Sequence, residues 1–221
     1  MIDLSKVQKR TTADIARRIV QDIPDGAHVN LGIGQPMTIS NYLPSDKEIL
    51  LHSENGLLGM GPLAKDHEID EELVNAGKQP VTMLPGASLC YHADSFVMIR
   101  GGHIDICVLG AFQVSVKGDI ANWRTGDPKA IPAVGGAMDL ALGAKKLFVM
   151  MEHLTKSGES KLVKECTYPL TALAAVDCVY TDLATIAVTP EGLVAVDWVD
   201  GLSFEDLQTL SDVPMIKGSQ R

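Results

Sequence analysis

Apolar and polar positions follow a helical period most clearly near the start of the chain. Residues 11–23 place apolar side chains three to four positions apart, with Arg17 and Arg18 on the opposite face. Thr11 can cap this segment, Asp14 stands three residues later, and residues 24–26 (Pro-Asp-Gly) can end it. The pattern therefore predicts an amphipathic helix over residues 11–23. Its apolar stripe consists of Ile15, Ala16, Ile19, Val20 and Ile23.

Many other apolar residues fall in short runs, which are typical of strands buried on both faces. The expected strands lie at residues 29–31, 49–51, 104–110, 146–151 and 174–180. The first run enters Gly32-Ile33-Gly34, Pro36 is placed to begin a helix, and a second short helix is expected around residues 138–142. Strands that alternate with helices predict an α/β fold, with an open, mainly parallel sheet covered by helices on both faces.

Two hairpins and a closing helix complete the expected elements. Residues 114–120 contain a turn signal at Lys117-Gly118, and residues 186–194 contain another at residues 189–192. Ser203, with Asp206 three residues later, can cap a short helix. Residues 154–160 are expected to form a loop. Because no repeat or linker divides the chain, one domain spanning residues 1–221 is expected.

Composition limits the classes of function. The net charge is −9 and no lysine-arginine cluster occurs, which argues against a nucleic-acid surface. No apolar run is long enough for a membrane span, and the start of the chain does not resemble a signal peptide. The four cysteines are scattered without a CxxC pair. They favour free thiols and a cytoplasmic protein over a disulfide scaffold.

The most informative segment is Ser53-Glu54-Asn55-Gly56, which follows the apolar residues 49–51. Residues 57–62 after it are rich in glycine, and we expect them to form a turn that lets the backbone approach a ligand. Because α/β proteins bind ligands at the carboxyl ends of strands, Glu54 is a candidate reactive group. The alternative interpretation is a polar turn that carries a solvated glutamate.

Other polar residues carry weaker signals. His103, Asp105 and Cys107 would share one strand face, but the apolar residues between them favour a packed strand, and no metal site is expected. Gly32 and Gly34 could cradle a phosphate, although a close strand-to-helix turn is favoured. The isolated histidines are His52, His92 and His153, and the possible anion contacts are Arg100, Arg124, Lys156 and Lys161.

Six blocks of the sequence, in order, resemble the class I (glutamate-type) coenzyme A transferases, specifically their B or beta subunit. The blocks are residues 30–36 (Asn-Leu-Gly-Ile-Gly-Gln-Pro), 53–56 with 59–62, 100–105 with 109–114, 118–123, 135–140 and 166–171. A tetrapeptide alone would be weak evidence, whereas six ordered blocks identify the family.

The resemblance implies a role for each of several residues. In such a transferase Glu54 attacks the donor thioester, and CoA is then held on Glu54 as a glutamyl thioester. Gly135 and Gly136 would present backbone N–H groups to the oxyanion, and Asn55 is a further candidate for that site. A CoA thioester would be the substrate, with no permanently bound cofactor. The partner would be the CoA-transferase alpha subunit, in a heterodimer or heterotetramer.

The resemblance extends to a branch of the family. The variants at residues 52–60, 114–118 and 153–161 look most like the branch that moves CoA from succinyl-CoA to 3-oxoadipate in the degradation of aromatic compounds. The branch that uses acetate or butyrate with acetoacetate stays open. A non-catalytic regulatory module on the same fold would have no use for a glutamate near glycine donors. A sugar-phosphate isomerase would need a phosphate-binding loop that residues 32–36 lack.

Overall fold

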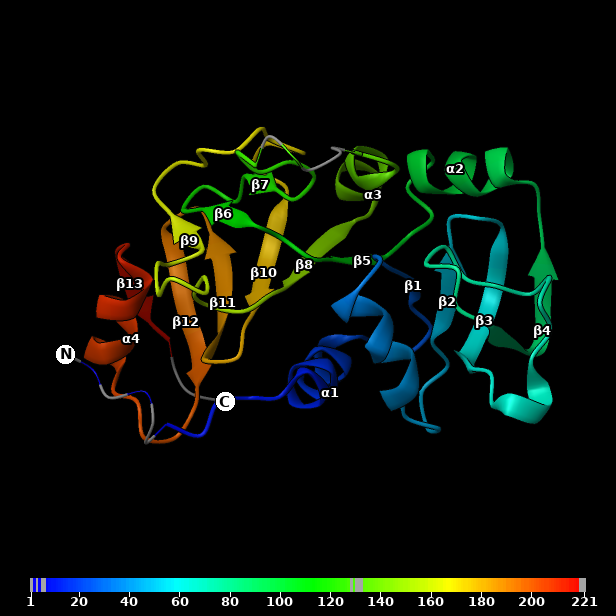
Figure 1. Cartoon of the computed structure of the whole chain (residues 1–221), viewed down its shortest axis with the longest axis horizontal. Coiled ribbons are helices and arrows are strands. Elements are labelled where there is room, and N and C mark those ends of the chain that lie inside the picture. Colours follow the sequence, from blue (N-terminus) through cyan, green and yellow to red (C-terminus); the bar gives the residue numbers. More distant parts are fainter. Residues whose placement is uncertain (1, 3, 5–6, 128, 130–132, 219–221) are drawn as a thin grey trace.

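A ten-stranded sheet forms the centre of the protein, whose computed structural model describes residues 2, 4, 7–127, 129 and 133–218 (Figure 1). The strand order is β13-β12-β11-β10-β8-β5-β1-β2-β3-β4. The bounds are β1 (His28–Leu31), β2 (Leu50–Ser53), β3 (Leu57–Leu63), β4 (Val81–Leu89), β5 (Ile106–Leu109), β8 (Lys146–Met150), β10 (Val176–Tyr180), β11 (Ala184–Thr189), β12 (Gly192–Trp198) and β13 (Met215–Lys217). Strands β10, β8, β5, β1 and β2 pair in parallel, and antiparallel pairs flank them. The predicted mainly parallel α/β sheet is confirmed.

Helices cover both faces of this sheet, and each face has its own core. Cys107 and Val149 belong to one core, whereas their neighbours Val108 and Phe148 belong to the other, because successive strand residues point to opposite faces. Helix α1 (Thr12–Asp22) and the 3-10 helix η2 (Gln35–Tyr42) pack into the second core. Helices α2 (His92–Arg100), α3 (Ala137–Gly143) and α4 (Phe204–Ser211) pack into the first. In the described part of the chain, no helix has the length and apolar character needed to cross a bilayer.

The helix caps behave as the sequence indicates. Thr11 and Asp14 form a reciprocal capping box at the start of α1, and Ser203 and Asp206 form another at the start of α4. The predicted stripe of α1 is buried against the sheet. Pro36 lies in the first turn of η2, so the helix predicted there exists, but in the tighter 3-10 form.

The expected turn at residues 57–62 is wrong. These residues begin strand β3, which pairs with β2 on one side and with β4 on the other. A Cβ on Gly59 would lie 2.9 Å from Ala87, and a Cβ on Gly61 would collide with Thr82, both residues of β4. The glycines therefore allow a strand, and not a ligand, to approach closely. The short 3-10 helix η3 (Asp66–Glu68) lies in the connection between β3 and β4.

A small second sheet, in the order β7-β6-β9, lies beyond the ends of the central strands (Figure 1). Its strands are β6 (Gln113–Ser115), β7 (Ile120–Ala121) and β9 (Leu162–Val163). The hairpin predicted at Lys117-Gly118 joins β6 to β7, and the one predicted at residues 189–192 joins β11 to β12. Gly118 has a φ of +82°, which explains the glycine in the first turn. Residues 154–160 form the expected loop before β9.

Candidate active site

Four neighbouring parallel strands, β2, β1, β5 and β8, end at the same edge of the sheet. The first residues beyond their carboxyl ends are Glu54, Gly32, Gly110 and Met151, respectively. All four residues line one cavity of about 540 Å³. The sequence therefore places Glu54 where α/β proteins bind ligands, as predicted.

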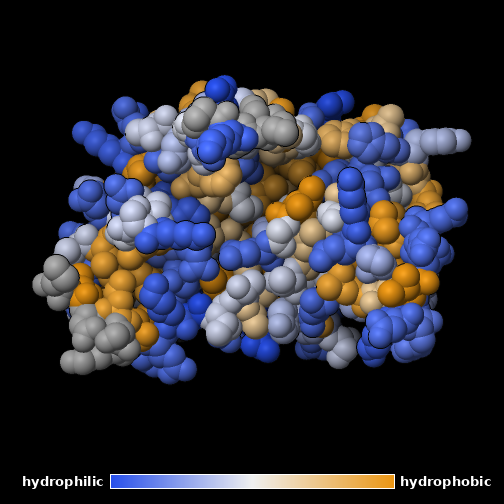
Figure 2. Space-filling view, viewed as in Figure 1, coloured by the Kyte–Doolittle hydropathy of each residue, from blue (hydrophilic) through white to orange (hydrophobic). Residues whose placement is uncertain are grey.

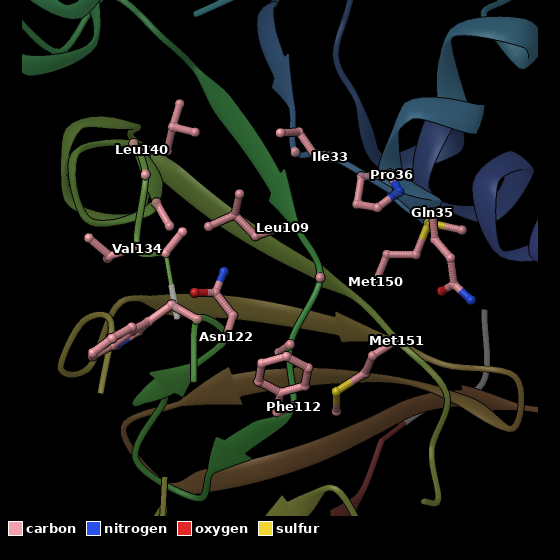
Figure 3. Close-up of a pocket in the computed structure, with 18 of the residues that line it drawn as sticks. Ile33, Gln35, Pro36, Leu109, Phe112, Asn122, Val134, Leu140, Met150 and Met151 are labelled. Atoms are coloured by element: carbon pink, nitrogen blue, oxygen red, sulfur yellow. The ribbon is translucent and has the colours of Figure 1, made fainter. Parts of the chain in front are cut away.

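The walls of this cavity are mainly apolar. Figure 3 shows Leu109 and Phe112 between Ile33 and Pro36 on one side and Val134 and Leu140 on the other. The space-filling view shows apolar surface gathered in the hollow between η2 and α3 (Figure 2). Among the described residues that line the cavity, the charged ones are Glu54, Glu152 and Lys161.

A sharp turn between β2 and β3 presents Glu54 to the cavity. Gly56 has a φ of +114°, and its N–H donates to the Ser53 carbonyl at 2.9 Å. A Cβ on Gly56 would collide with the Cys90 carbonyl, so glycine is needed both for the conformation and for the approach of the chain before α2. The Ser95 hydroxyl of α2 donates to the carbonyl of Glu54 and so holds the turn against α2.

The Glu54 carboxylate is oriented by Asn30, a fully buried residue of β1. The Asn30 Nδ2 donates to Glu54 Oε2 at 3.2 Å and to the His52 carbonyl at 3.2 Å, and it lies 3.1 Å from His52 Nδ1. No role for Asn30 was predicted from the sequence. The available signal was an amide between the apolar residues Val29 and Leu31, two positions before Gly32.

The groups around Asn30 are kept neutral by burial. Burial lowers the pKa of His52, which is 1% exposed, and so favours the neutral imidazole beside the Asn30 amide. The Cys107 thiol lies beside the side-chain oxygen of Asn30. Burial and the nearby charge of Glu54 raise the pKa of this thiol well above the usual value. Burial likewise raises the pKa of the other free thiols, Cys90, Cys166 and Cys178. These cysteines are therefore poor nucleophiles at neutral pH.

Gly135 and Gly136 line the same cavity as Glu54. Gly135 has a φ of +54°, which favours glycine, and Gly136 is the N-cap residue directly before helix α3. A Cβ on Gly136 would lie 2.8 Å from the Phe96 ring of α2, so a larger residue would push α2 and α3 apart. The structure thus brings the predicted glycine pair and the predicted carboxylate to one cavity.

Asn55 is not part of this arrangement. Its Nδ2 donates to the Val74 carbonyl at 2.7 Å, and it is not among the residues that line the cavity. Asn55 therefore holds the connection between β3 and β4 against the turn. The amide that contacts the Glu54 carboxylate is that of Asn30.

Several other candidate residues have structural partners. Asp105 pairs with Lys145 at 2.7 Å and accepts from the His28 N–H, and Arg100 pairs with Asp139 at 2.7 Å. The His153 ring is hydrogen-bonded to Thr181 and Ser211.

Within the described residues, no three His, Cys, Asp or Glu side chains are grouped as metal ligands would be. The remaining candidates include the exposed Arg124, Lys156 and His92 and the half-buried, cavity-lining Lys161.

Comparison with known proteins identifies the family. Residues 12–200 match the family model described as Coenzyme A transferase. The chain belongs to the coenzyme A transferase family. The B subunit of the 3-oxoadipate CoA-transferase of Pseudomonas putida is 62% identical over 210 residues, covering 95% of this chain and 98% of that protein. The beta subunit of the acetate CoA-transferase of Escherichia coli is 51% identical over 170 residues, covering 77% of each chain.

Solved structures support the same fold. The acyl-CoA transferase YdiF of Escherichia coli O157:H7 superposes with a TM-score of 0.75 at 17% identity, over 96% of this chain. This chain spans 42% of the YdiF chain. The fold expected from the resemblance is thus confirmed. The family match and the 62% identity to the Pseudomonas putida subunit show that the chain is a CoA-transferase.

Proposed function

We propose that Glu54 is the nucleophile of a transferase that moves CoA between two carboxylic acids. The observation that carries this proposal is the Asn30–Glu54 hydrogen bond at the edge of the cavity that Gly135 and Gly136 also line. Asn30 binds one carboxylate oxygen and leaves the other to react. A carboxylate is already ionised at neutral pH and, unlike a serine hydroxyl, needs no general base. The neutral His52 is therefore not required to remove a proton from the nucleophile.

The reaction consists of two acyl exchanges at Glu54, which the acceptor acid then reverses. An oxygen of Glu54 attacks the thioester carbonyl of the donor, a C–O bond forms, the C–S bond breaks, and the CoA thiolate leaves. The thiolate then attacks the side-chain carbonyl of Glu54, which forms a glutamyl-CoA thioester and releases the donor acid as a carboxylate. The acceptor carboxylate runs the same steps backwards, so the kinetics are ping-pong.

Each attack creates a tetrahedral oxyanion that needs hydrogen-bond donors. The backbone at Gly135 and Gly136 can supply them, because neither residue carries a side chain and Gly136 lies at a helix start. One such donor is typically worth about 3 kcal/mol of barrier. The apolar walls would exclude water, which protects the anhydride and the thioester from hydrolysis.

The proposed reaction is transfer of CoA from succinyl-CoA to 3-oxoadipate, with a separate alpha subunit as the partner in a hetero-oligomer. The 62% identity to the B subunit of a 3-oxoadipate CoA-transferase supports the acceptor and the partnership alike. CoA thioester is a substrate in this reaction, and no permanent cofactor takes part. The four free cysteines support a reducing location, and we place the enzyme in the cytoplasm.

The test is a panel of acceptors assayed with this chain and its alpha subunit, with succinyl-CoA as the donor. We expect kcat/KM to be higher for 3-oxoadipate than for acetoacetate, by roughly ten- to a hundredfold if one charge-assisted hydrogen bond binds the second carboxylate. Equal or better use of acetoacetate would favour the alternative branch, which the 51% identity to the beta subunit of an acetate CoA-transferase supports. Absence of any CoA transfer would favour the non-catalytic module.

A further inference from the structure

Lys161 is the cationic side chain among the described residues that line the cavity. It is half-buried, and in the described part of the chain no carboxylate lies within 4.0 Å of its ammonium group. Lys9 and Lys145, by contrast, pair with Asp182 at 3.0 Å and Asp105 at 2.7 Å. A half-buried ammonium without an ion pair, in a cavity with apolar walls, is matched by an anionic ligand.

The backbone of Lys161 is firmly held. Its N–H donates to the His153 carbonyl at 3.0 Å, and its carbonyl accepts from the Val114 N–H at 3.0 Å. Burial lowers the pKa of Lys161, while the carboxylates of Glu152 and Asp182 act in the opposite direction and favour the charged form. Asp182 cannot turn toward Lys161 without cost, because it already binds Lys9 and the N–H of His153.

Lys161 and Glu54 line the same cavity from separate segments of the chain. The strand order places β2, which carries Glu54, three strand spacings from β8, and Lys161 is bonded to the segment that follows β8. Three spacings correspond to about 14 Å between backbones. The carboxyl carbons of an extended six-carbon diacid are ~6 Å apart, from standard C–C bond lengths. With contacts of ~3 Å at each end, the diacid spans ~12 Å from the Glu54 carboxylate to an ammonium. That span is of the same order as the separation between the two backbones.

We propose that Lys161 binds the distal carboxylate of a dicarboxylic acyl group whose other carboxyl carbon reacts at Glu54. This inference rests on the proposed function and names the residue that selects a diacid. It applies to the donor and the acceptor, because succinyl and 3-oxoadipyl groups both carry a free carboxylate. The four-carbon chain is shorter, and the flexible lysine side chain can follow it. A monoacid leaves the ammonium unpaired.

The test compares Lys161→Met with Lys161→Arg and with the control Lys164→Met, whose lysine is exposed and lies outside the cavity lining. Each variant is assayed with the alpha subunit, succinyl-CoA, and either 3-oxoadipate or acetoacetate. In ping-pong kinetics kcat/KM for the acceptor reports only its own half-reaction. Lys161→Met should lower kcat/KM for 3-oxoadipate by roughly ten- to a hundredfold, mainly through KM, and leave that for acetoacetate little changed. Lys161→Arg should recover much of the loss, and Lys164→Met should match the wild type.

A second readout separates this inference from the proposed function. The rate at which CoA is trapped on the protein is compared for succinyl-CoA and acetyl-CoA, without any acceptor. Lys161→Met should slow trapping from succinyl-CoA selectively. If the wild type prefers acetoacetate but this selective loss occurs, the proposed acceptor is wrong and the role of Lys161 stands. If Lys161→Met affects diacid and monoacid alike, or affects neither, Lys161 does not select the diacid.

Discussion

At the scale of single residues, the site depends on one buried amide that touches three groups. Asn30 binds the Glu54 carboxylate and the His52 carbonyl and approaches the His52 ring, all from the end of β1. A carboxylate that must attack a carbonyl carbon works best when it is held in one orientation. In the proposed mechanism Asn30 is therefore a positioning residue, because it would act on substrate only through Glu54.

Replacing Asn30 with alanine should lower kcat by roughly ten- to a hundredfold, because a small misplacement of a reacting group is costly. KM for succinyl-CoA should change little. Stability should fall by about 1–3 kcal/mol, since the His52 carbonyl loses its buried partner. Thr185→Ala is the control: Thr185 is also buried and hydrogen-bonded, to Arg10, but lies on β11 away from the cavity. Equal kcat in Asn30→Ala and wild type would contradict the role.

His153 predicts how stability depends on pH. It is fully buried between Thr181 and Ser211, and burial lowers its pKa from 6.5 to about 4. The unfolded chain therefore binds this proton more readily than the folded chain. The contribution of His153 is complete above pH 6.5 and is lost as the pH falls toward 4, by about 3 kcal/mol at most.

Urea unfolding of wild type and His153→Gln between pH 7 and pH 4 tests this dependence. The free energy of unfolding should fall less steeply with acidification in His153→Gln than in the wild type. His67→Gln is the control, because His67 is exposed, and it should keep the wild-type slope. Parallel curves for wild type and His153→Gln would show that another group is responsible.

The sequence predicted Glu54 but not its support, and the reason is physical. Glu54 stands in a local pattern, a strand end followed by glycine, that can be recognised within a few residues. Asn30 matters only because β1 pairs with β2, which brings together residues 24 positions apart. Asn55 is adjacent to Glu54 in sequence, yet its amide points to Val74. Adjacency in the chain was the misleading signal.

At the scale of elements, most helices and strands follow from local patterns, and the exception is the segment from β3 to α2. In β3, Gly59 and Gly61 interrupt the apolar alternation, so the pattern reads as a turn. The reason for these glycines is visible only in the folded sheet, where β4 lies close against them. Helix α2 has a weakly amphipathic sequence and begins without a side-chain cap, so the usual start signal is missing.

Gly59→Ala tests this account of β3. Gly59 has a φ of +84°, and an added Cβ would lie 2.9 Å from the Ala87 backbone of β4. The strained conformation alone costs about 1–3 kcal/mol for a residue other than glycine. Gly126→Ala is the matched control, because nothing lies within 4 Å of its added Cβ and its φ is not positive. Equal unfolding free energies for the two variants would contradict the strand role of Gly59.

At the scale of the whole molecule, the chain supplies the proposed nucleophile in a cavity at the sheet edge, and the relatives that it resembles are named as subunits. We therefore expect the purified chain to transfer no CoA alone and to gain activity on mixing with its alpha subunit. Mass spectrometry of each preparation, alongside the transfer assay, checks this. Full activity in a sample that contains only this chain would refute the dependence on a partner.

In the proposed mechanism CoA becomes covalently bound to Glu54. The direct measurement incubates the assembled enzyme with succinyl-CoA, reduces the thioester with borohydride, which releases CoA, and locates the residue whose mass has changed by peptide mass spectrometry. We expect the Glu54 carboxyl group to be converted to a primary alcohol, with loss of activity. Glu54→Ala should stay folded, trap no CoA and transfer almost none. A reduced carboxyl group at a residue other than Glu54, or ordinary transfer by Glu54→Ala, would contradict the mechanism.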